Sequence, residues 1–183
     1  MAAPVRTPRE TWLEGGLRLL ASGGPDAVRV EPLAKELGVT KGGFYHHFAD
    51  RQALLEALLD TWEERLVDEA IETVDRGGGD ARTRLRRLFA LAAAGGRLFQ
   101  VELAVRDWGR RDDQVAARVR RVDDRRMAFL RPLFAEFCQG PADVEGRSLL
   151  VLTLFVGSAF VDADHGRRTR DQAHAAAIRH LLR

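Results

Sequence analysis

One short segment of the chain has the residue types and order suited to contact with nucleic acid. Residues 40–48 read Thr-Lys-Gly-Gly-Phe-Tyr-His-His-Phe. Thr40 can hydrogen-bond a phosphate or place its methyl group against a thymine methyl, and Lys41 can reach a guanine edge in the major groove. Gly42 and Gly43 lack side chains, so the backbone amides there can approach a phosphate closely. The segment therefore predicts a DNA-contacting helix.

The apolar residues of this segment predict which of its faces points inward. Phe44 and Phe48 are four residues apart, so on a helix they share one face, and with Val39 they point into a small core. Tyr45 and His46 are then left outward, where each can hydrogen-bond a phosphate beside the groove.

The residues before this segment predict a second helix joined to it by a tight turn. Residues 30–37 carry apolar side chains at helical spacing, and Gly38 supplies the left-handed residue that ends a helix. The small Ala34 allows the following helix to cross closely. The apolar face consists of Val30, Leu33, Ala34 and Leu37.

Helical spacing continues through the whole chain, without the sustained alternation typical of strands. Thr7, Pro8 and Glu10 form a capping pattern that predicts a first helix, which Gly23-Gly24-Pro25 ends. Asp50 predicts the cap of a long fourth helix, and residues 76–80 a flexible loop. Further helices are predicted at 81–94, 97–110, 113–138, 142–163 and 169–182. The predicted fold class is all-α, with about nine helices.

Composition narrows the class of protein but does not decide its function. The 183 residues are 45% hydrophobic, enough for a packed core, and a net charge of +2 permits contact with phosphate without requiring it. The single Cys138 cannot form an internal disulfide and is expected to be a buried thiol. The N-terminus has no signal-peptide pattern, and the apolar stretch 149–161 is too short to span a membrane. We expect a cytoplasmic protein without membrane contact.

Metal binding is not predicted from the histidines and carboxylates. His46 and His47 are adjacent, so on a helix they point about 100° apart and cannot share an ion well. Asp162, Asp164 and His165 fall at a predicted helix end, where polar residues are expected.

Catalysis is not predicted either. Ser148 and Ser158 lie in apolar helical surroundings, and no Gly-x-Ser-x-Gly pattern is present. The carboxylates alternate with arginines, as in the run 110–113, which is typical of solvated helix faces. We therefore predict no catalytic residues and no cofactor.

The helix-turn-helix segment resembles the TetR family of bacterial transcription regulators, of the TetR/AcrR type. The similarity rests on Gly38-Val-Thr-Lys-Gly42, on Tyr45-His-His-Phe48 and on the following Asp50-Arg51, and it covers about residues 9 to 60. The sequence departs at Arg29, where many members have a Thr or Ser cap; Arg29 instead adds a cation where phosphate could lie. The predicted DNA contacts are Arg29, Thr40, Lys41, Gly42, Gly43, Tyr45, His46 and Arg51.

The resemblance implies a DNA-binding domain over 1–47 and a helical regulatory and dimerisation domain over 48–183. It implies a homodimer formed through 142–163 and 169–182, and the near-continuous apolar surface of 149–161 agrees with burial on more than one side. It also implies a repressor that binds an inverted-repeat operator and responds to a small-molecule effector.

The effector is expected among the fourth to eighth helices. Glu102 and Arg106, four apart in an apolar helix, are either a self-satisfied surface pair or the polar groups of the effector cavity. The predicted effector contacts are Trp62, Phe99, Glu102, Arg106, Trp108, Phe129, Leu133 and Phe155. Two alternatives stay open, namely a constitutive DNA-binding protein without an effector and an enzyme that uses the helical cavity.

Overall fold

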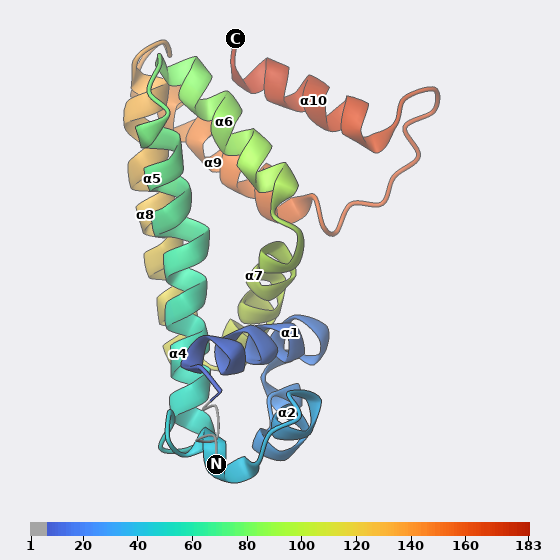
Figure 1. Cartoon of the computed structure of the whole chain (residues 1–183). Coiled ribbons are helices and arrows are strands. Elements are labelled where there is room, and N and C mark those ends of the chain that lie inside the picture. Colours follow the sequence, from blue (N-terminus) through green and yellow to red (C-terminus); the bar gives the residue numbers. More distant parts are fainter. Residues whose placement is uncertain (1–6) are drawn as a thin grey trace. The chain divides into compact units, whose positions relative to one another are not determined.

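The computed structural model describes residues 7–183, and all regular elements within them are helices (Figure 1). They are α1 (Arg9–Ala27), α2 (Val30–Glu36), α3 (Lys41–Phe44), α4 (Arg51–Glu63), α5 (Glu69–Arg76), α6 (Ala81–Ala94), α7 (Gly96–Gly109), α8 (Asp113–Ala135), α9 (Pro141–Gly157) and α10 (Arg170–Leu181). A π-helical segment, Glu64–Asp68, joins α4 to α5, so the described residues hold nine continuous helical runs. The predicted all-α fold class is confirmed.

The helices divide into two compact units. Unit 1 holds the described residues up to Leu66 together with Gly96–Val119, and unit 2 holds Val67–Gly95 and Arg120–Arg183. Unit 1 therefore contains α1 to α4, α7 and the beginning of α8. The predicted division between residues 47 and 48 concerns which part contacts DNA and which part binds an effector, and it stays a prediction.

Two glycines let α1 pack closely in unit 1, where it contacts α2, α4 and α7 (Figure 1). A Cβ atom on Gly15 would lie 2.6 Å from Leu33 Cδ1 of α2. A Cβ atom on Gly16 would lie 2.9 Å from Leu58 Cδ2 of α4. Both distances are shorter than carbon atoms tolerate, so the absence of side chains sets the spacing of these helices.

An aromatic core, formed by Trp12, Phe44 and Phe48, joins α3 to α1. The exposed fractions of these side chains are 0%, 0% and 4%. The ring centroids of Trp12 and Phe44 are 5.5 Å apart in an edge-on arrangement, and those of Phe44 and Phe48 are 5.3 Å apart and stacked. The predicted inward direction of Phe44 and Phe48 is confirmed.

The helix ends follow the predicted signals in part. Asp50 caps α4 by accepting a hydrogen bond from the Ala53 amide at 2.8 Å, as predicted. The predicted capping box on Thr7 is wrong, because Pro8 is the N-cap residue of α1 and makes no side-chain capping bond. Gly23 and Gly24 leave the helical conformation, so α1 is interrupted where the sequence predicted its end.

Helix α9 is shorter than the predicted range 142–163, because it ends at Gly157. Glycine is a weak helix former, and the Ser158 hydroxyl donates a hydrogen bond to the Phe155 carbonyl at 2.8 Å, which competes with further helical bonding. The apolar residues Phe160 and Val161 therefore lie beyond the helix, with exposed fractions of 73% and 58%.

Unit 2 has a core of its own, and α10 lies at its margin. The core is built from α6, α8 and α9 and includes Leu85, Leu130, Leu133, Phe134 and Val151. A long connection leads from α9 to α10, which has no buried residue between Arg170 and Leu181 (Figure 1). Arg82 and Arg147 each donate a hydrogen bond, both at 2.8 Å, to the carbonyls of Leu182 and Leu181 respectively, so the last turn is the fixed end of α10.

No single helix among residues 7–183 is long and apolar enough to cross a membrane, although α6 and α7 reach that length and composition when they are taken together as a bent pair.

We expect Phe44→Ala to lower the free energy of unfolding by about 3–5 kcal/mol, because it empties the centre of a small core. Chemical denaturation followed by circular dichroism measures this loss, and Tyr45→Ala, at a side chain that is 53% exposed, is the control. Equal stability of the two variants would contradict the inward placement of Phe44.

Candidate nucleic-acid interface

The turn between α2 and α3 depends on Gly38. Its φ angle of 67° lies in the left-handed region, which favours glycine. The Gly38 amide donates to the Lys35 carbonyl at 3.2 Å and the Val39 amide donates to the Ala34 carbonyl at 3.0 Å, so the end of α2 is capped by its own backbone. Leu33 and Ala34 are buried beneath the turn. The predicted helix-turn-helix is confirmed.

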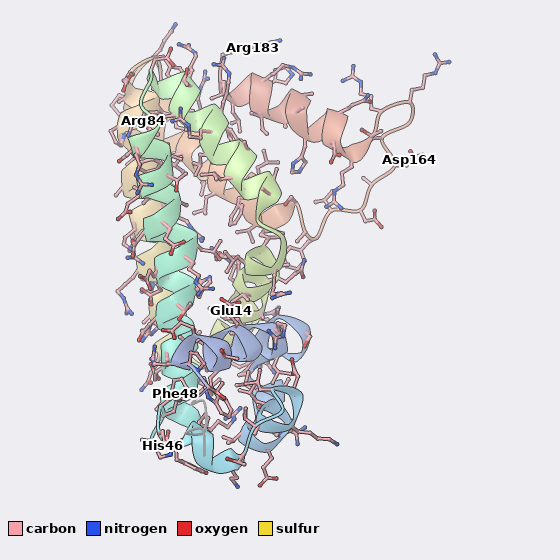
Figure 2. The ribbon with its side chains drawn as sticks, viewed as in Figure 1. Glu14, His46, Phe48, Arg84, Asp164 and Arg183 are labelled. Carbon is pink, nitrogen blue, oxygen red and sulfur yellow. The ribbon has the colours of Figure 1, made fainter. Side chains whose placement is uncertain are left out.

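The polar residues of the α3 segment lie on the outside of unit 1. Thr40, Lys41, Tyr45 and His46 are all exposed, and the Tyr45 side chain has an exposed fraction of 53%. His46 lies at the outer surface in Figure 2. We call Thr40, Lys41, Gly42, Gly43, Tyr45 and His46 the reading face. The structure brings these six predicted residues together.

Neither backbone conformation nor internal packing explains the two glycines of the reading face. Gly42 and Gly43 lie within the helix α3, and neither has a positive φ angle. A Cβ atom on Gly42 would meet only Thr40 Oγ1, at 3.8 Å, and one on Gly43 would meet Trp12 Cζ2 at 3.7 Å. These are ordinary contact distances, unlike those at Gly15 and Gly16. The missing side chain of the exposed Gly42 therefore leaves space outside the chain, whereas the Cβ direction of Gly43 faces Trp12, at a distance that would still admit a methyl group.

Lys41 is held by a carboxylate from the neighbouring helix. Its Nζ donates a hydrogen bond to Glu31 Oε1 at 2.8 Å, and both side chains are exposed. The hydrogen bond and the charge of Lys41 lower the pKa of Glu31, and Glu31 in turn raises the pKa of Lys41. Both groups are therefore charged at neutral pH. The sequence alone does not predict this contact, because Glu31 lies ten positions before Lys41, beyond the spacings that helical periodicity connects.

Arg29 and Arg51, the remaining predicted DNA contacts, differ in how they are placed. Arg29 is the exposed N-cap residue of α2 and makes no side-chain capping bond. Arg51 is half-buried, with Nε donating to the Val28 carbonyl at 2.6 Å and Nη2 donating to the Pro25 carbonyl. Two donors of Arg51 thus tie α4 to the end of α1, and its contact with phosphate stays a prediction.

His47 is a neighbour of the reading face that the sequence analysis assigned no DNA contact. It is half-buried, and its Nε2 donates a hydrogen bond to the Thr7 carbonyl at 2.8 Å. This bond links the segment that precedes α1 to the end of the α3 turn.

Five of the predicted effector contacts lie in unit 1, where Glu102 is the central group. Its carboxylate is fully buried, accepting a hydrogen bond from Trp62 Nε1 at 2.8 Å and another from Arg106 Nε at 2.7 Å. The predicted Glu102–Arg106 pair is therefore present, with the carboxylate in the interior and not at the helix surface. Trp108 is also buried, and Phe99 is half-buried.

The other three predicted effector contacts lie in unit 2. Leu133 is 1% exposed and belongs to the core, and Phe129 packs against that core. Phe155 is half-buried, with the Arg126 guanidinium 5.3 Å from its ring centroid. The eight predicted residues thus fall in both units, and their use in one effector site stays a prediction.

Residues 13–58 match the sequence profile described as "Bacterial regulatory proteins, tetR family". This range contains the helix-turn-helix and most of the reading face's supporting core. The segment that forms the helix-turn-helix therefore has the sequence pattern of TetR-family DNA-binding segments.

One curated protein is similar to part of the chain. Over 80 residues the chain is 31% identical to the nucleoid occlusion factor SlmA of Marinobacter nauticus, and the match covers 44% of this chain and 40% of that protein. The chain thus spans about two fifths of the length of this curated relative.

Two solved structures share the fold over nearly the whole chain. One is the ketosteroid transcriptional regulator KstR2 of Mycobacterium tuberculosis, with a TM-score of 0.66, 18% identity and coverage of 99% of this chain and 96% of that one. The other is AibR in complex with isovaleryl coenzyme A and operator DNA, with a TM-score of 0.65, 20% identity and coverage of 94% and 97%.

Unit 2 has an open groove that includes the single cysteine of the chain. The groove has a volume of about 520 Å³ and lies between the end of α8 and the start of α9. Burial raises the pKa of the Cys138 thiol, so the thiol is protonated at neutral pH. Cys138 is half-buried, and not fully buried as the sequence predicted. None of the predicted effector contacts lines this groove.

In the part of the chain that the structure describes, no three His, Cys, Asp or Glu side chains are grouped so that they could hold a metal ion.

Proposed function

We propose that the chain is a transcription regulator of the TetR family, a cytoplasmic, ligand-responsive repressor that binds an inverted-repeat operator as a homodimer through the reading face. The observation that carries the DNA contact is the pair Gly42 and Gly43, which have helical backbone and no internal need for glycine. Glycine at these positions is useful when another surface must approach the backbone closely, as a DNA phosphate does.

The side chains around these glycines supply the complementary chemistry. The Lys41 ammonium can donate to guanine O6 and N7, which is a common base-specific contact in the major groove. Thr40, Tyr45 and His46 surround it with groups that hydrogen-bond phosphate oxygens. The exposed Arg29, at the start of α2, extends this surface with a further cation. Phosphate contacts set the register of the protein on the duplex, and the lysine contact specifies sequence.

A response to a small molecule is supported by the relatives and by the environment of Glu102. AibR was solved with an acyl coenzyme A and operator DNA, and KstR2 is described as a ketosteroid regulator. In this chain Glu102 joins α7 to Trp62 of α4, the helix that follows the reading face. A ligand that competes for the carboxylate or for the Arg106 guanidinium would change how α4 is held. This arrangement favours a ligand-responsive regulator over an enzyme.

Dimerisation is supported by exposed apolar side chains in unit 2. Leu149 and Leu150 of α9 have exposed fractions of 56% and 55%, and Phe160 and Val161, which follow the helix, are also exposed. Adjacent exposed leucines on one helix favour burial against a second copy of the chain. One α3 segment offers few base contacts, and a two-fold axis that doubles them supplies the specificity that a genome requires.

We expect Lys41→Ala and Tyr45→Phe to weaken binding to a duplex that the wild-type protein selects from a random library, with thermal unfolding nearly unchanged. The loss at Lys41 should be about 1–3 kcal/mol if the lysine reads a base, with relaxed preference at one position. Fluorescence anisotropy measures the affinity, and addition of metabolite pools to the complex separates a ligand-responsive repressor from a constitutive binder. Unaltered affinity of both variants would remove the reading face from the proposal.

We expect a stable dimer at micromolar concentration, and monomers from Leu150→Arg, because a charged side chain in an apolar interface is not compensated. Light scattering measures the mass. Ala90→Arg, which adds the same side chain at an exposed position of α6, is the control and should leave the dimer intact. A monodisperse wild-type monomer would contradict the proposed homodimer, in which two reading faces bind one operator.

A further inference from the structure

The ion pair between Glu31 and Lys41 places a negative charge beside the one lysine of the reading face. We propose that Glu31 is a specificity-determining residue. Its carboxylate pairs with Lys41 and repels phosphate on arbitrary DNA. The ion pair opens only where Lys41 can donate to a guanine in a matching site. This inference rests on the proposed DNA contact through the reading face. It assigns a function to a residue of α2 that makes no favourable phosphate contact of its own.

The geometry allows the lysine to change partner without unfolding. Glu31 lies in the first turn of α2 and Lys41 begins α3, and their Oε1 and Nζ atoms are 2.8 Å apart. The side chains have exposed fractions of 74% and 50%, so DNA can reach both. Ion pairs in such surroundings contribute little net stability, because water solvates the separated charges well. A base that accepts two hydrogen bonds from the lysine can therefore replace the carboxylate.

The second acidic residue of α2 behaves differently and supplies an internal comparison. Glu36 accepts hydrogen bonds from Arg18 of α1 at 2.8 and 3.1 Å. Its pair thus joins two helices of the domain and includes no residue of the reading face. The two glutamates carry the same charge on the same seven-residue helix, yet only Glu31 contacts a residue that reads DNA.

The effect on DNA binding follows from the different demands of the two kinds of site. Binding to arbitrary DNA depends almost entirely on cations that neutralise phosphates, and a carboxylate among them opposes it. At a matching site Lys41 donates to guanine, and the released Glu31 carboxylate can accept a hydrogen bond from cytosine N4. Glu31 therefore lowers the affinity for wrong sequences more than the affinity for the right one, and specificity is this difference.

The experiment compares Glu31→Gln with Glu36→Gln, which make the same change of charge on the same helix. The probes are a duplex that the wild-type protein selects from a random library and a scrambled duplex of equal composition. We expect Glu31→Gln to tighten binding to the scrambled duplex about 10-fold and to the selected duplex by less than about 3-fold, with a steeper salt dependence on scrambled DNA. Glu36→Gln should change both affinities by one small, equal factor.

A Lys41→Ala background tests whether the effect passes through the lysine. There Glu31→Gln should still relieve the repulsion of phosphate, but its preference for the scrambled duplex over the selected one should shrink, because Lys41 is no longer present to change partner. Circular dichroism on each variant confirms that unit 1 is folded. The proposal is overturned if Glu31→Gln and Glu36→Gln shift the two duplexes equally, or if Glu31→Gln weakens binding to both. If the wild-type protein enriches no duplex from the library, the proposed function itself fails, and that result precedes any comparison of variants.

Discussion

The contact of Phe44 with Trp12 and Phe48 is the interaction on which the DNA-binding surface depends. Helix α3 has only four residues, too few to be stable by its own hydrogen bonds. Its direction is set because Phe44 and Phe48 are buried against Trp12 of α1. Since these two rings point inward, Lys41, Tyr45 and His46 face solvent. The reading face is thus a consequence of where the aromatic side chains are fixed.

The same unit holds α4 by polar contacts with its neighbours α1, α7 and α8. Glu102 of α7 accepts the Trp62 indole hydrogen, and Arg118 of α8 donates to Asp60 and Glu63 at 2.7 and 2.8 Å. Arg51, at the first turn of α4, donates to the carbonyls that end α1. Helix α4 is therefore tied near both of its ends, and it also packs against α1.

Sequence reasoning succeeded where neighbours along one helix carry the information. The spacing of Phe44 and Phe48, the turn at Gly38 and the cap at Asp50 are local signals, and the structure has all of them. It failed where the partner lies on another helix. The pairing of Glu31 with Lys41 and the burial of Glu102 against Trp62 depend on how helices pack, and 3.6-residue periodicity does not report that. The predicted end of α9 was too late, because apolar character continues past the residue where the backbone stops being helical.

The central claim is that the glycines of the reading face serve an approaching DNA backbone and nothing within the chain. Gly42→Ala tests this most directly when thermal unfolding and affinity for the selected duplex are measured on the same sample. A Cβ atom there meets only Thr40 Oγ1, at 3.8 Å, and alanine favours a helix over glycine by about 1 kcal/mol. The account predicts an unfolding midpoint equal to or above that of the wild-type protein, together with a clear loss of affinity. Unchanged affinity with unchanged stability would contradict it.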